Sequence, residues 1–230
     1  STTLLILLLR PIAVRTGLVD MPNERKSHQI PTPLVGGLAI FAGLAMAFLL
    51  TIADGAAPHM REILSFFGGG LLLVTVGVID DFIDLSPLAR FVAQIVAALL
   101  MVFGAGVVLT DLGGMTPSGQ LLTMGVFAVP FTVFATLGVI NALNMCDGLD
   151  GLSGSLSLVS LVGLFLAAWL WGDVADVILL PLLGSAVVGF LLFNLRLPGR
   201  ERASIFMGDA GSMFLGFALT WYTVSLSQGE

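Results

Sequence analysis

The sequence predicts an all-α, polytopic transmembrane helical bundle of about eight spans, forming a single integral membrane domain over residues 1–230. Three observations lead to this prediction. Hydrophobic residues make up 57% of the chain and charged residues only 10%, whereas charged residues make up about 25% of a soluble domain. The mean hydropathy is +1.05. Apolar runs of about 20 residues, the length needed to cross a bilayer, recur throughout. Such runs cross lipid as helices, because a helix satisfies the hydrogen bonds of its own backbone.

The N-terminal half contains four apolar runs, which we expect to be helices at 2–15, 34–53, 62–79 and 88–109. The first is short and is interrupted by Arg10-Pro11, so we expect it to be the end of a longer helix. The second follows a proline-rich loop that ends in Gly36-Gly37. The third stops where a run of carboxylates begins at Asp80, and the fourth contains no charged residue after Arg90.

The C-terminal half contains four more runs, which we expect to be helices at 121–140, 152–171, 177–195 and 211–227. The fifth and sixth are separated by a polar stretch that ends at Gly151, and the seventh ends before Arg196. The eighth follows the glycine-flanked Asp209, and the sequence stops just after it. We therefore expect the chain to be a segment of a longer protein.

Charge predicts the orientation. Alternating spans place the connections 16–33, 80–87, 141–151 and 196–210 on one side, with eight of the nine basic residues on or nearest it; these are Arg10, Arg15, Arg25, Lys26, Arg90, Arg196, Arg200 and Arg202. Only Arg61 falls on the other side, so the first side is predicted to be cytoplasmic. A net charge of −6 without a basic stripe argues against a nucleic-acid partner. The single cysteine, Cys146, excludes an internal disulfide.

Two polar clusters lie in the first half of the chain. The loop 22–33 carries Arg25, Lys26 and His28, which either anchor the chain by positive charge or donate to an anionic headgroup or diphosphate. Asp80, Asp81 and Asp84 follow an apolar run, with Asp80 and Asp84 expected on one helix face and Asp81 on another. Three carboxylates at a membrane mouth either form a solvated helix end or require a compensating cation.

Two more clusters lie in the second half. Asn141, Asn144, Asp147 and Asp150 recur every three residues, which places their oxygens on one helical stripe and favours Mg²⁺ or Mn²⁺ over Zn²⁺. The turn at 205–212 puts Asp209 at a helix start, where it either caps the helix or joins backbone N–H groups in holding phosphate and its cation. Phe206 beside it offers a ring to a nucleobase, although core packing is the alternative.

All four clusters are predicted to meet on one side of the membrane. Carboxylates and amides for a metal, with basic donors for phosphate, indicate metal-assisted phosphoryl transfer in which one substrate is a lipid. A membrane ion transporter is the alternative class, but a transporter needs polar residues at mid-span depth, and the predicted spans are nearly free of charge.

The four motifs together resemble one enzyme family. P-N-E-R-K-x-H-x-x-P-x-P-x-x-G-G, D-D-x-x-D, N-x-x-N-x-x-D-G-x-D-G-L and F-M-G-D-A-G-S occur in this order over about residues 17–216. They resemble the polyprenyl-phosphate N-acetylhexosamine-1-phosphate transferases, especially the bacterial branch that uses undecaprenyl phosphate and starts O-antigen and related cell-envelope glycans. The sister branch, phospho-MurNAc-pentapeptide transferase, is the alternative specificity.

The resemblance implies Mg²⁺-dependent transfer of GlcNAc-1-phosphate from UDP-GlcNAc to undecaprenyl phosphate at the cytoplasmic face of the bacterial inner membrane, with release of UMP. Mn²⁺ is the alternative ion, GalNAc is an alternative sugar, and a homodimer is compatible with the family. By resemblance, Asn144 and Asp209 are the metal ligands. The remaining matched positions contact the lipid phosphate (Asp80, Asp81), the nucleotide (Asp147, Asp150, Phe206) and phosphate groups (Lys26, His28).

One departure from the family pattern concerns histidine. The family carries a histidine-rich cytoplasmic motif further downstream, and this sequence contains only His28 and His59. We expect direct attack of the lipid phosphate on the β-phosphorus of the donor. A phosphomonoester is already mostly dianionic at neutral pH, so Asp80 and Asp81 are expected to position it more than to deprotonate it. A covalent aspartyl intermediate is the rival scheme.

Overall fold

The computed structural model describes residues 1–21, 31–53, 59–114, 121–171, 178–196, 198–200 and 202–228, and helices dominate this part of the chain. The elements are α1 (Thr2–Thr16), β1 (Val19–Asp20), β2 (Thr32–Pro33), α2 (Gly36–Ala53), α3 (Met60–Ile83), α4 (Pro87–Leu99), the π-helix η1 (Leu100–Ala105), the 3-10 helix η2 (Gly125–Phe127), α5 (Ala128–Cys146), α6 (Leu152–Trp171), α7 (Leu179–Asn194) and α8 (Gly208–Ser227). The predicted all-α class is confirmed, with a two-residue antiparallel ladder between β1 and β2 as an unpredicted addition.

The expected spans correspond to the observed helices, with one displacement. The fifth was predicted at 121–140, but α5 starts at Ala128 and continues to Cys146. Residues before it form a short hairpin instead, in which Leu112 N donates to Leu122 O at 2.9 Å and Met124 N donates to Thr110 O at 2.7 Å. The first residues of the apolar run predicted at 121–140 therefore belong to the connection before α5 and not to the helix.

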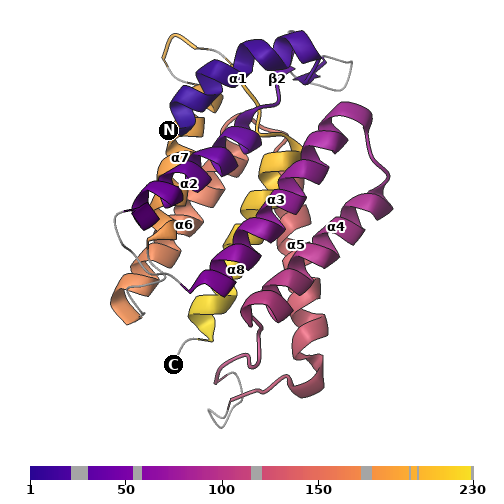
Figure 1. Cartoon of the computed structure of the whole chain (residues 1–230), viewed down its shortest axis with the longest axis vertical. Helices are drawn as coiled ribbons and strands as arrows, with labels where there is room; N and C mark the ends of the chain where they lie inside the picture. The colour runs from indigo at the N-terminus through magenta and orange to yellow at the C-terminus, as the bar shows by residue number, and fades with distance from the viewer. Residues whose placement is uncertain are drawn as a thin grey trace.

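Hydropathy and length make this a multi-pass membrane protein. Four helical segments are long and apolar enough to cross a bilayer: Met60–Ile83, Pro87–Ala105, Gly125–Cys146 and Leu152–Leu170. The apolar parts of α2 and α7 are shorter. Helix α1 lies obliquely across one end of the bundle (Figure 1), packed against α2 and α7. Because it has 15 residues, fewer than the ~20 that span, its expected role as part of a span stays a prediction.

Helix α8 is the centre of the bundle, in contact with α2, α3, α5 and α6 (Figure 1). Every residue from Ala210 to Tyr222 is buried. Two glycines allow this packing at the N-terminal end of the helix. A Cβ on Gly37 of α2 would lie 2.1 Å from the Gly211 nitrogen, and one on Gly77 of α3 would lie 2.3 Å from the Ala210 Cα, so only glycine lets these helices approach so closely.

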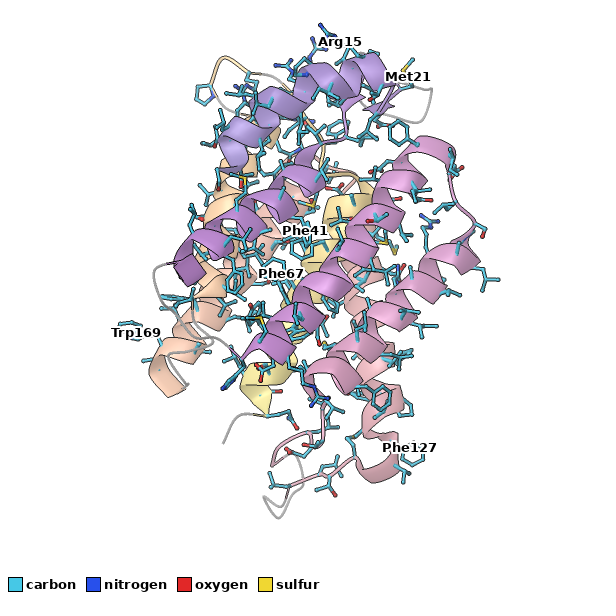
Figure 2. The ribbon with its side chains drawn as sticks, viewed as in Figure 1. Arg15, Met21, Phe41, Phe67, Phe127 and Trp169 are labelled. Carbon is cyan, nitrogen blue, oxygen red and sulfur yellow. The ribbon has the colours of Figure 1, made fainter. Side chains whose placement is uncertain are left out.

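Aromatic packing holds the same helices together toward the middle of the bundle. Phe41 of α2 and Phe67 of α3 face each other between the two helices, with ring centroids 6.0 Å apart (Figure 2). Phe41 also meets Phe214 of α8 edge to face at 5.1 Å. Rings in this geometry add to the stability gained by burial alone.

One end of the bundle gathers the predicted polar connections. Helices α3, α5 and α7 end there, α6 and α8 begin there, and the β1–β2 ladder lies beside them (Figure 1). Figure 2 shows Arg15 and Met21 at this end and Phe127 at the opposite end. The alternation of connections deduced from the sequence is thus confirmed within the described residues. We call the end with Arg15 the polar end.

Candidate active site

A cavity of about 670 Å³ opens at the polar end. Its polar lining consists almost entirely of oxygen-bearing side chains: Asp20, Asp80, Asp81, Asp84, Asn144, Asp147, Asp150, Asn194 and Asp209. Leu34, Gly148, Leu149, Phe206 and Gly208 complete the wall. The volume lies in the ~300–1,000 Å³ range of small-molecule sites. The structure therefore brings together every site residue predicted from the sequence except Lys26 and His28, which lie outside the described residues.

Asp209 occupies the first turn of α8 because of the glycine before it. Gly208 has a φ of +73°, a left-handed conformation that suits glycine. A Cβ there would also lie 2.5 Å from Asp81 Oδ2. The backbone N–H of Asp209 donates to Asp81 Oδ1 at 3.0 Å, so the start of α8 is tied to the end of α3.

Asp81 corrects an expectation about the acidic run. Asp81 was expected to point away from Asp80, but both side chains line the cavity. The expectation that Asp80 and Asp84 share a helix face was also wrong, because α3 ends at Ile83 and Asp84 adopts a φ of +54°. The second carboxylate oxygen of Asp81, Oδ2, is buried and has no hydrogen-bond partner among the described residues.

Asp80 is held on both oxygens. Oδ1 accepts from Leu85 N at 2.6 Å, and Oδ2 accepts from Arg90 Nη1 at 3.1 Å. The same Arg90 nitrogen lies 3.4 Å from Asp209 Oδ2. Arg90 thus joins the carboxylates of two helices, although sequence reasoning treated it only as an orienting charge. Its position one helical turn into α4, just after the acidic run, is the signal that could have identified it.

Asn144 and Asp209 meet directly. Asn144 Nδ2 donates to Asp209 Oδ1 and, at 2.9 Å, to Ser212 Oγ. Rotation of the terminal amide torsion would present the Asn144 oxygen instead. Together with the unpartnered oxygen of Asp81, this donor set of carboxylate and amide oxygens fits Mg²⁺ or Mn²⁺.

The protein would supply only part of the ligands of a metal ion at this site. Among the described residues, no three His, Cys, Asp or Glu side chains converge as a preformed metal cluster. Mg²⁺ commonly binds through one or two carboxylates and takes its other ligands from water and substrate phosphates. An ion at Asp209 and Asn144 would therefore be completed by the substrate.

Asp147 follows the last residue of α5 and lines the cavity. Its Oδ1 accepts from Ser153 Oγ of α6, a fully buried hydroxyl. The pKa of Asp147 is raised to about 7, mainly by burial and also by the charge of Asp209, against the lowering effect of the Ser153 hydroxyl and the Gly208 N–H. Asp147 is thus a carboxylate whose charge depends on the partners that enter the cavity.

Asp150 and Asn194 fasten the connections that form the wall. Asp150 Oδ2 accepts from Arg196 Nε at 2.8 Å and from Ala203 N at 3.1 Å. The buried Asn194 accepts from Gly151 N at 2.8 Å and donates to Ile205 O at 2.9 Å. The structure therefore gives Asp150 a clear supporting contact in addition to its place on the wall.

Phe206 is half-buried on the cavity wall, where its backbone is fixed. Its N–H donates to Pro33 O at 2.9 Å, and its carbonyl accepts from Gly36 N at 3.0 Å. Asp20 also lines the cavity, carried there by the β1–β2 ladder that sequence reasoning did not predict. Asn141, the first member of the predicted stripe, is not part of the wall and pairs with Gln94 instead.

Comparison with known proteins gives a consistent result. Residues 63–227 match the family described as glycosyl transferase family 4. The chain is 39% identical over 229 residues to the undecaprenyl-phosphate alpha-N-acetylglucosaminyl 1-phosphate transferase of Salmonella typhi, covering 100% of this chain and 60% of that protein. The proteins of the same name from Escherichia coli K12 and Haemophilus influenzae are 37% and 36% identical, covering 100% and 99% of this chain and 60% and 62% of those proteins. The chain thus spans about 60% of the length of these curated relatives.

Proposed function

The chain belongs to glycosyl transferase family 4, and we propose that the protein transfers N-acetylglucosamine-1-phosphate from UDP-GlcNAc to undecaprenyl phosphate and releases UMP. The relatives' name supports this choice of acceptor and sugar. The observation that carries the proposal is the cavity at the polar end, in which carboxylates, amides and Phe206 from five parts of the chain converge beside lipid-spanning helices.

The donor would lie along the wall formed by the end of α5, the connection 147–150 and the start of α8. Phe206, half-buried on the cavity wall, would stack its ring on the uracil, and the positive end of the α8 dipole favours phosphate beside Asp209. Asp209 and Asn144 would hold Mg²⁺, which offsets the negative charge of the diphosphate and the departing UMP.

The acceptor would enter beside the end of α3. Asp80 has both oxygens engaged and is only 2% exposed, so its role is to position groups and not to remove a proton. Arg90 links Asp80 to Asp209 and provides the positive charge that a lipid phosphate approaching these carboxylates requires. A phosphate oxygen of the lipid then attacks the β-phosphorus, one P–O bond forms, and the bond to UMP breaks.

The membrane setting of the proposal is the bacterial inner membrane, with the polar end facing the cytoplasm. Basic residues at this end support that orientation through the positive-inside rule. The nucleotide sugar is a cytoplasmic type of substrate, and the lipid acceptor reaches the same mouth from within the bilayer.

The test is UMP release from UDP-GlcNAc by the full-length protein in membranes supplied with undecaprenyl phosphate, with and without Mg²⁺. The Asp209→Asn variant removes a charge at the proposed metal ligand, and we expect its rate to fall at least about 100-fold, because an interaction needed only in the transition state acts on the rate. Asp111→Asn, in the hairpin at the opposite end, is the matched control and should retain activity.

The same assay is run with UDP-GalNAc and with the peptide-bearing UDP-MurNAc donor, to identify which sugar the protein transfers. UMP release from one of these donors, without release from UDP-GlcNAc, would replace the proposed sugar donor but support the same transfer reaction. A folded protein that releases no UMP from any of the three would exclude the proposed transfer. A trapped phosphorylated or glycosyl-phosphorylated aspartate would replace direct attack with the covalent scheme.

A further inference from the structure

A second polar contact lies within the bundle directly below the cavity. Asn141 Nδ2 of α5 donates to Gln94 Oε1 of α4 at 2.7 Å, and Gln94 Nε2 approaches Met213 Sδ of α8 at 3.6 Å. Gln94 is only 2% exposed. Three helices therefore meet through two side-chain amides and the thioether of Met213.

Each of these residues lies one helical turn from Arg90, Asn144 or Asp209, of which the first two contact the third at the cavity. Gln94 is four positions after Arg90, and Met213 is four after Asp209, while Asn141 is three before Asn144. Residues three or four apart stack on the same face of a helix. Gln94, Asn141 and Met213 thus form a second layer, in which each residue lies one turn along the same helix from Arg90, Asn144 and Asp209 respectively.

The Arg90–Asp209–Asn144 contacts and the Gln94–Asn141 bond both depend on the positions of α4 and α5 along α8. Arg90 reaches Asp209 at 3.4 Å and Asn144 donates to the other oxygen, so both contacts depend on how far α4 and α5 are advanced along α8. A slide of either helix would separate the Gln94 and Asn141 amides. Asn141 would keep its second acceptor, Leu137 O of its own helix at 2.8 Å, but the buried Gln94 would lose the donor to its Oε1, and leaving a buried polar atom without a partner is costly.

The buried hydroxyls of Thr136 and Thr220 do not fix how the helices are placed along one another. Thr136 of α5 donates to Thr132 O, and Thr220 of α8 donates to Gly216 O, each within its own helix. Such bonds move with the helix that makes them. The Gln94–Asn141 bond, by contrast, joins two helices.

We propose that Gln94 and Asn141 are positioning residues: their hydrogen bond sets the register of α4 and α5 so that Arg90 and Asn144 meet Asp209. The inference rests on the proposed function, because it assigns Asp209 and Asn144 to the Mg²⁺ site. Supporting contacts behind metal ligands commonly alter metal affinity or activity by about 10- to 100-fold when removed.

The experiment compares Gln94→Met, Asn141→Leu and the double variant with the wild type, all as full-length protein. Gln94→Met preserves length and the contact with Met213 but removes the amide. Thr136→Val is the control, since it deletes a buried polar group from the same helix without breaking a bond between helices. The readouts are the thermal midpoint without Mg²⁺, the Mg²⁺ concentration giving half of the Mg²⁺-induced rise in that midpoint, and UMP release.

We expect each single variant to raise the half-saturating Mg²⁺ concentration about 10-fold and to lower kcat. The double variant should be no worse than the worse single one, because both lose the same bond. Thr136→Val should leave the Mg²⁺ dependence unchanged.

Single variants that lower only the Mg²⁺-free thermal midpoint, with unchanged half-saturation, would show a purely structural role and overturn the inference. Independent, additive effects would overturn it as well. A wild type that shows neither Mg²⁺-dependent stabilisation nor UMP release would instead refute the proposed function, and the inference with it.

Discussion

At the scale of single residues, burial decides how the cavity's carboxylates behave. Asp147 lies beyond the end of α5 with its pKa raised to about 7, first by burial and then by the charge of Asp209. In the unfolded chain the pKa of this carboxyl group lies near its ordinary value of 3.8. The folded state therefore binds the proton more tightly, and holding the ionised form destabilises the fold increasingly as pH rises from about 4 to about 7.

Asp147→Asn should remove this penalty. Without divalent cations, we expect the variant to melt above the wild type at pH 7.5 by several degrees, and to show little difference at pH 4. In a chain of this size about 1 kcal/mol moves the midpoint by roughly 2–4 °C. The measurement is the thermal midpoint of both proteins in detergent across this pH range. A difference that does not change with pH would contradict the assignment.

Residue type and spacing were enough to find most of the site. Asp80, Asp147 and Asp209 stand out because carboxylates are costly beside lipid, so each demands an explanation from the sequence alone. Arg90 was missed because one basic residue near a membrane end is well explained by orientation. Asp20 was missed because a two-residue ladder leaves no periodic pattern, yet that ladder delivers it to the cavity.

At the scale of helices, the packing around α8 depends on the absence of side chains. Gly77 and Gly68 lie on the same helix, α3, nine residues apart. A Cβ on Gly77 would lie 2.3 Å from the backbone of Ala210, whereas one on Gly68 would meet nothing within 4 Å. The two positions therefore separate the effect of packing from the effect of helix propensity.

Gly77→Ala should destabilise the protein by about 1–3 kcal/mol or more, because the neighbouring atoms are backbone and can yield only if α3 moves away from α8. Since Asp80 and Asp81 lie one turn further along α3, activity should fall as well. Gly68→Ala should be neutral or stabilising by up to about 1 kcal/mol. Thermal midpoints in detergent decide this, and equal effects at both positions would contradict the packing argument.

Helix ends were predicted less well than helices, for identifiable reasons. The sequence ended the fifth span at residue 140 and began it at 121, whereas α5 starts at Ala128 and continues through Asn141 and Asn144, the two amides that the sequence had placed on a helical stripe beyond the span. Both amides find partners on α4 and α8, so the helix can extend without exposing them to lipid. Which neighbour would supply those partners depends on tertiary packing, and no local pattern encodes it.

At the scale of the whole molecule, the charges are divided between the two ends. Among the described residues, Arg15, Arg90, Arg196, Arg200 and Arg202 lie at the polar end. Arg61 lies at the start of α3, at the other end, where its guanidinium donates to Phe103 O at 2.8 Å. The basic residues are thus distributed unequally between the two ends, as the sequence predicted. By the positive-inside rule, this distribution predicts that the polar end faces the cytoplasm.

The orientation can be tested with one cysteine at each end in a Cys146→Ser background. Pro198→Cys lies in the exposed connection between α7 and α8 at the polar end, and Val126→Cys lies in η2 at the opposite end, where the native side chain is 86% exposed. In intact spheroplasts, a membrane-impermeant maleimide should label Val126→Cys and should reach Pro198→Cys only after the membrane is opened. The reverse pattern would place the cavity outside, where a cytoplasmic nucleotide sugar could not enter it, and would exclude the proposed donor even if the fold and the metal ligands are correct.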